Sequence, residues 1–151
     1  MKEKAGQMEL FKFSNNANEN DFEKIARRFN LRMILAFGSA VSTRVHPQSD
    51  VDIAVLCKKP DLSMEKYSDL LFELQKLIPE REVDLAVINQ ADPLFLKKIM
   101  ERNEILYGKE SDLARLKIYA FKRYVDHRKY FRMEEEFARR FIARYAGEAG
   151  E

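Results

Sequence analysis

The sequence Met33-Ile34-Leu35-Ala36-Phe37-Gly38-Ser39 is followed, after ten further residues, by Asp50-Val51-Asp52-Ile53-Ala54-Val55-Leu56. Each segment contains a short apolar run, and together they predict two strands joined by a loop. Alternate side chains of a strand share a face, so we expect Asp50 and Asp52 to project to one side and Val51, Ile53 and Val55 to the other. The pattern predicts a second strand that carries two carboxylates at its start.

The carboxylates and the loop together indicate a phosphate-binding metal site. Two ionised carboxylates held together repel each other unless a multiply charged cation lies between them. A few anionic oxygen ligands are typical of Mg²⁺, which takes its other ligands from waters and substrate phosphates. Gly38 allows the backbone to approach a phosphate, and Ser39 adds a hydroxyl donor. These residues predict the binding of a nucleoside triphosphate.

A third apolar run, at residues 83–88, carries Asp84. With this residue, Gly38-Ser39 and Asp50-Val51-Asp52, the chain resembles the DNA polymerase β-like nucleotidyltransferase superfamily. Within it, the chain is similar to the minimal nucleotidyltransferases (MNT) that act as antitoxins of HEPN-domain ribonuclease toxins. The resemblance runs from about residue 21 to at least residue 108. It implies an α/β (α+β) fold, in which helices flank a small mixed β-sheet.

The resemblance also implies a reaction and a set of site residues. Asp50, Asp52 and Asp84 would be the catalytic and metal-binding residues and would hold two Mg²⁺ ions. Gly38 and Ser39 would position the triphosphate of ATP. AMP would then pass to a tyrosine of a cognate HEPN toxin, which would lose its ribonuclease activity.

The loop before Asp50 departs from the pattern of the superfamily. Relatives usually carry Arg-Gly or Thr-Gly near its middle, where this chain has Ser42-Thr43. Arg44 is a candidate nucleotide-binding residue because a guanidinium suits bidentate phosphate contact, and a solvated loop arginine is an equally good interpretation. We expect His46-Pro47 to shape the turn into the next strand, without a catalytic role for His46.

Fold and metal site do not select the acceptor of the nucleotidyl group. One alternative is a small-molecule nucleotidyltransferase similar to the aminoglycoside adenylyltransferases. Another is a non-catalytic antitoxin that neutralises its toxin by binding alone. The presence of all three aspartates argues against that last alternative.

Composition fits one domain in a reducing compartment. The chain of 151 residues is 34% charged, yet its net charge of +2 gives no general reason to expect a nucleic-acid or membrane partner. Its one cysteine, Cys57, cannot form an internal disulfide and is expected in the core, and a cytoplasmic location follows. We expect a flexible leader at 1–19, a nucleotidyltransferase domain at 20–108 and a C-terminal helical arm at 109–151.

Helical periodicity and capping signals locate the other elements. We predict a helix from Asp21, capped by Asn20 or Asp21 itself, and helices capped by Ser63 and Asp92. Four strands are expected, at residues 32–37, 51–56, 83–88 and 104–107.

The tail from residue 111 to about residue 146 predicts one long helix, with a break near Glu134-Glu135-Glu136 left open. At about 1.5 Å per residue, this helix is longer than the core is wide. Its apolar stripe must therefore pack on its own domain, in a homodimer or on the toxin. His127 lies on this stripe and is expected to be a packed or interface histidine.

Overall fold

The computed structural model describes residues 17–41 and 50–148. Its centre is a four-stranded mixed sheet in the order β3-β2-β1-β4. The strands are β1 (Leu31–Phe37), β2 (Val51–Cys57), β3 (Val83–Val87) and β4 (Asn103–Tyr107). β1 is antiparallel to both β2 and β4, whereas β2 and β3 are parallel. This arrangement confirms the predicted mixed sheet with flanking helices.

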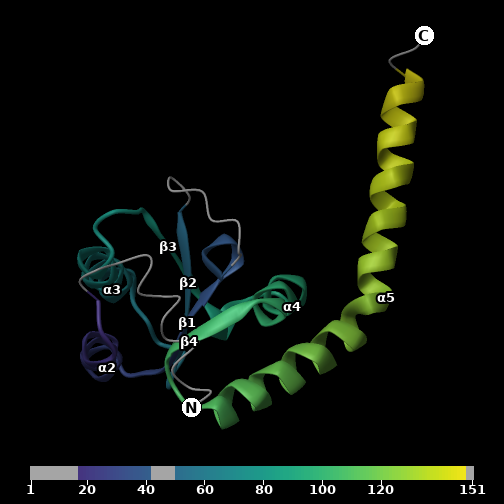
Figure 1. Cartoon of the computed structure of the whole chain (residues 1–151). Coiled ribbons are helices and arrows are strands. Elements are labelled where there is room, and N and C mark those ends of the chain that lie inside the picture. The colour runs from purple at the N-terminus through teal and green to yellow at the C-terminus, as the bar shows by residue number, and fades with distance from the viewer. Residues whose placement is uncertain (1–16, 42–49, 149–151) are drawn as a thin grey trace.

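Helices cover both faces of the sheet (Figure 1). On one face lie α2 (Glu19–Arg28) and α3 (Met64–Leu77), and on the other lie α4 (Pro93–Glu101) and the first part of α5 (Glu110–Glu148). The helix α3 connects the parallel strands β2 and β3, as a parallel pair requires. The result is a three-layered α/β/α body.

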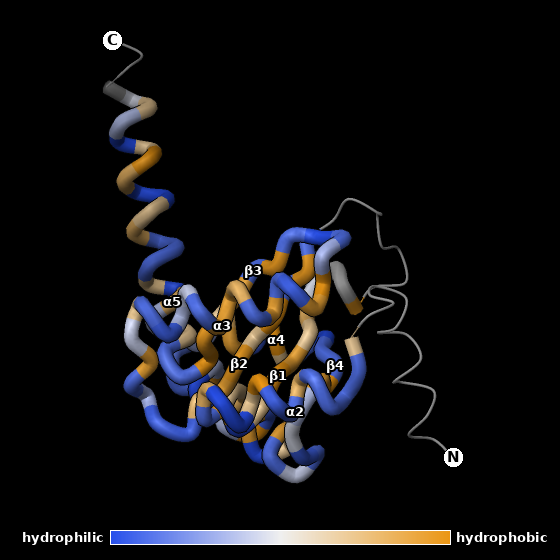
Figure 2. The backbone as a smooth tube through the Cα atoms, turned by 90° about the vertical axis from the view of Figure 1, so that its left-hand side faces the viewer, coloured by the Kyte–Doolittle hydropathy of each residue, from blue (hydrophilic) through white to orange (hydrophobic). Residues whose placement is uncertain are grey.

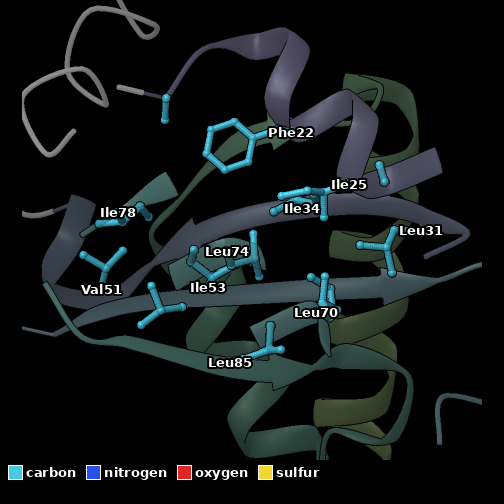
Figure 3. Packing of buried hydrophobic residues seen from close by; sticks show 14 of the residues in the cluster. Phe22, Ile25, Leu31, Ile34, Val51, Ile53, Leu70, Leu74, Ile78 and Leu85 are labelled. Carbon is cyan, nitrogen blue, oxygen red and sulfur yellow. The ribbon is translucent and has the colours of Figure 1, made fainter. Parts of the chain in front are cut away.

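Strand alternation divides the core between the two layers of helices. Val51, Ile53 and Val55 of β2 pack with residues of α2 and α3, among them Phe22 and Leu74 (Figure 3). The alternate residue Ala54 packs toward α4 and α5. Asp52 is two residues before Ala54 and therefore lies on the α4 side of the sheet. Cys57 is buried, as expected, and its pKa is raised by burial and then by Asp61.

Two local predictions need correction. The N-cap of α2 is Asn18, because its side chain accepts a hydrogen bond from the Asp21 backbone while the Asp21 side chain accepts one from the Asn18 backbone. The predicted caps Asn20 and Asp21 lie inside the helix. The strand expected at 83–88 ends at Val87, since Ile88 begins the short helix η2 (Ile88–Gln90). Ser63 and Asp92 do cap α3 and α4.

The helix α5 is continuous over 39 residues and does not break at the acidic triplet. Its first part is held on the body by buried Leu113, Leu116 and Ala120. Its second part extends away from the body (Figures 1 and 2). His127 is half-buried, bonds through Nδ1 to the Arg123 carbonyl oxygen and contacts the rings of Tyr130 and Phe131, all within α5.

None of the helices in the described part of the chain combines the length and the hydropathy needed to cross a membrane. The expected leader at 1–19 falls largely outside the described residues. The domain boundaries at 19/20 and 108/109 stay a prediction.

Candidate active site

Asp52 and Asp84 are direct register partners on the parallel strands β2 and β3. Adjacent strands lie about 4.8 Å apart, and partner side chains share a face of the sheet. Asp52 also pairs with Phe37, the last residue of β1, and Phe37 pairs with Asn103 at the start of β4. The two aspartates therefore belong to one row of residues that crosses the sheet at the amino ends of β2 and β3.

Gly38 follows β1 and lies against the carboxylate of Asp52. Its φ of +67° belongs to the left-handed region that favours glycine. A Cβ atom at this position would lie 2.5 Å from Oδ2 of Asp52. The conformation therefore favours glycine here, and a Cβ atom would force the Asp52 carboxylate to move. Gly38, which was predicted to allow close backbone approach to a phosphate, lies beside Asp52, one of the predicted metal ligands.

Negative charge is concentrated around Asp52. Burial raises the pKa of the Asp52 carboxyl, and the neighbouring charges of Asp84 and then Asp50 raise it further, while Lys98 lowers it. Asp50 is exposed just before β2, Asp84 is exposed and Asp52 is half-buried. All three predicted carboxylates thus interact electrostatically around Asp52.

The carboxylates do not form a complete metal cage by themselves. Within residues 17–41 and 50–148, no group of three His, Cys, Asp or Glu side chains is arranged to hold a metal ion. The adjacent pair Asp52 and Asp84 nevertheless fits Mg²⁺, because this ion is usually bound by one or two carboxylates plus waters and substrate phosphates. Burial is the largest cause of the raised pKa of Asp52, and a cation would relieve the further contribution from the charges of Asp84 and Asp50. The three-carboxylate ligand set stays a prediction.

The other two predicted nucleotide-binding residues are Ser39 and Arg44. Ser39 lies in the short helix η1 (Gly38–Val41), and its side chain is outside the description. Arg44, Ser42-Thr43 and His46-Pro47 lie outside the described residues. Their predicted roles are untested.

Lys98 of α4 was not predicted as a site residue. The helix packs on the Asp52 side of the sheet, where Leu96 and Ile99 are buried. Phe95 contacts Phe37 edge-to-face, with ring centroids 5.9 Å apart. Helical spacing places Lys98 beside Phe95, and its charge acts on Asp52. The sequence signal was the position of Lys98 one turn after Phe95, but its use required the packing of α4 to be known.

Gln75 is a second residue that sequence reasoning missed. Its side-chain amide nitrogen donates to the carbonyl oxygens of Ile78 and Arg81 at 2.8 and 2.6 Å, and its oxygen accepts from the Val83 backbone nitrogen at 2.9 Å. These bonds join the end of α3 to the first residue of β3. Gln75 thereby positions the strand that carries Asp84.

The fold and the site are those of an α/β protein with a mixed sheet and paired carboxylates beside a glycine in the left-handed conformation. The family model described as polymerase beta, nucleotidyltransferase matches residues 20–112. The chain belongs to the polymerase beta nucleotidyltransferase family. No curated protein matches the sequence.

Solved structures share this fold at low sequence identity. A toxin–antitoxin crystallised with AMP-PNP contains a chain that is 23% identical, with a TM-score of 0.67, over 81% of this chain and 99% of that one. A tri-AMPylated Shewanella oneidensis HEPN toxin in complex with an MNT antitoxin gives 21% identity and a TM-score of 0.62, over 80% of this chain and 95% of the other. An MntA–HepT toxin–antitoxin gives 21% and 0.61, over 80% and 96%. These likenesses show the fold.

Proposed function

We propose that this protein is a Mg²⁺-dependent nucleotidyltransferase that acts as an antitoxin, by transferring AMP from ATP to a tyrosine of a cognate HEPN ribonuclease toxin. The observation that carries the proposal is the register pairing of Asp52 with Asp84 beside Gly38. Family membership supports nucleotidyl transfer. The toxin as acceptor is supported by the resemblance to MNT antitoxins and by the AMPylated toxin in a complex of the same fold.

In the proposed reaction, Asp52 and Asp84, assisted by Asp50, would hold Mg²⁺, which would supply positive charge to neutralise the phosphates of ATP. Gly38 lets the backbone after β1 lie against the Asp52 carboxylate, because a Cβ atom there would meet Oδ2. Asp84 is exposed and can accept the phenolic proton of the incoming tyrosine. An O–P bond forms at the α-phosphorus, the bond to the bridging oxygen breaks, and pyrophosphate leaves with the electron pair.

The second part of α5 provides the proposed contact surface for the toxin. Four of its large apolar side chains recur every four residues and are exposed: Met133, Phe137, Phe141 and Tyr145. Aromatic residues are enriched at protein interfaces, and Arg139, Arg140 and Arg144 lie on the same segment. This segment, residues 133–145, is called the aromatic arm below. Pairing with a second copy of the chain is the alternative use of the arm.

The test incubates the purified protein with Mg²⁺ and ATP labelled at the α-phosphate, in the presence of the product of an adjacent HEPN gene, an aminoglycoside, or neither. Label on the toxin supports the proposal. Label on the aminoglycoside instead would favour a small-molecule transferase. A tight complex without transfer, unchanged by Asp52→Asn, would show neutralisation by binding alone. The reaction belongs in the cytoplasm, where ATP is available and the thiol of Cys57 stays reduced.

A further inference from the structure

Lys98 lies at the edge of the candidate site on the same side of the sheet as Asp52. Phe95, one turn earlier in α4, contacts the ring of Phe37, which is the register partner of Asp52. At the end of α4, the side chain of Asn103 donates to the carbonyl oxygens of Ile99 and Met100 at 3.1 and 3.3 Å. Asn103 itself pairs with Phe37. The last turn of α4 is therefore anchored at both ends to the row of residues that contains Asp52.

The ammonium group of Lys98 has no carboxylate partner in the described parts of the chain. No oxygen of Asp50, Asp52 or Asp84 lies within 4.0 Å of Nζ, although the charge of Lys98 acts on Asp52. Lys98 is exposed. Lys98 is thus an exposed cation of the helix that packs on the Asp52 side of the sheet, and it makes no ion pair with the carboxylates there.

The neighbouring Lys97 provides an internal contrast. It forms an ion pair with Glu101 at 3.4 Å, and its Nζ lies 4.3 Å from the ring centroid of Tyr124 on α5. Lys97 therefore serves the packing of α4 on α5. Lys98, one residue later, projects about 100° away around the helix and makes neither kind of contact with residues 17–41 or 50–148.

We propose that Lys98 binds a phosphate oxygen of the nucleotide and completes the binding site from the α4 side. This inference rests on the proposed function, since it needs a nucleoside triphosphate at the aspartates. The contact is a charge-assisted hydrogen bond between an ammonium and a phosphate. Lys98 would hold the phosphates opposite the metal-binding carboxylates.

The test measures equilibrium binding of AMP-PNP and of adenosine, in the presence of Mg²⁺, to the full chain and to Lys98→Gln, Lys98→Arg and Lys97→Gln. We expect Lys98→Gln to weaken AMP-PNP binding about tenfold or more, because a hydrogen bond between charged groups is lost. Adenosine has no phosphate, so its affinity should be the same for Lys98→Gln and wild type. Lys98→Arg should recover most of the AMP-PNP affinity, and Lys97→Gln should bind as wild type does. In transfer assays, the KM for ATP should rise more than kcat falls.

A helical cation near a helix C-terminus can also have a purely structural role. In that case Lys98→Gln would lower Tm and would leave AMP-PNP binding within about twofold of wild type. This result would overturn the proposed phosphate contact of Lys98 but not the proposed function of the protein. A failure of the wild-type protein to bind AMP-PNP with Mg²⁺ would overturn the proposed function, and the role of Lys98 with it.

Discussion

Asp52 and Asp84 lie side by side because β2 and β3 pair in parallel with these two residues in register. On the other side of Asp52 the chain leaves β1 at Gly38, where a Cβ atom would meet the carboxylate. The acidic pair therefore results from strand pairing, and the close approach of the backbone to Asp52 depends on one glycine.

Gly38→Ala should damage both stability and transfer. The left-handed conformation at +67° costs a non-glycine residue about 1–2 kcal/mol, and the new Cβ would displace Asp52. A displacement of this kind can reduce activity on the order of 100-fold. Thermal unfolding and AMP transfer are the measurements. The control Gly147→Ala meets no atom within 4 Å and should leave both unchanged; full activity in Gly38→Ala would contradict the assigned role of the glycine.

Asp52→Asn should abolish transfer and, without divalent cations, stabilise the fold. Because the pKa of Asp52 is raised above the ordinary 3.8 of an aspartate, the stability linked to this carboxyl is fully present in acid and is lost as the pH rises through the raised pKa. The asparagine removes this charge penalty, so we expect Tm to rise by about 1–4 °C at neutral pH and the difference to shrink in acid.

Scanning calorimetry in EDTA over a series of pH values checks that prediction, with Asp69→Asn as the control because Asp69 is exposed on α3. Added Mg²⁺ and AMP-PNP should stabilise the wild-type protein and should not stabilise Asp52→Asn. A lower Tm for Asp52→Asn at neutral pH would mean that the carboxylate is stabilising in the free protein, against this account.

Gln75→Ala should destabilise the fold by about 2–3 kcal/mol, since it removes three partly buried hydrogen bonds that are each worth about 1 kcal/mol. Denaturant unfolding measures the change. Transfer should also fall, because β3 and Asp84 lose their anchor to α3. The matched control is Gln90→Ala, at an exposed position, which should change stability by less than about 0.5 kcal/mol. Equal stability of the two variants would show that the Gln75 bonds contribute nothing.

Phe137→Ala combined with Phe141→Ala should weaken toxin binding on the order of 100-fold while leaving Tm unchanged. The two rings stack with centroids 6.2 Å apart and are 70% and 53% exposed, so the body does not depend on them. Phe72→Ala, which removes an exposed ring on α3, is the control. Binding is measured by calorimetry and the mass of the free protein by light scattering. If the double variant binds the toxin as tightly as wild type but the free protein changes from dimer to monomer, the aromatic arm is a homodimer interface.

Much of this structure could be predicted from local sequence patterns. Alternation in residues 51–56 correctly predicted that Asp52 lies opposite Val51 and Ile53, and Ser63 and Asp92 were recognised as caps. The cap at Asn18 was missed because apolar periodicity begins only at Phe22, although the pair Asn18 and Asp21 has the spacing of a capping box.

What sequence could not predict depends on tertiary pairing. The register that makes Asp84 the partner of Asp52 is a property of two strands separated by a helix. Lys98 becomes a site residue only through the packing of α4 on the sheet, and Gln75 only through the turn between α3 and β3. No short-range pattern encodes any of these three relationships.

The most direct measurement is intact mass spectrometry of the HEPN toxin after co-expression with this protein. With the wild-type chain, the toxin should carry a mass increase equal to one or more AMP units on a tyrosine, and its ribonuclease activity should be lost. With Asp52→Asn or Asp84→Asn, the toxin should keep its unmodified mass. An unmodified toxin that wild type and both variants neutralise equally well would contradict the account.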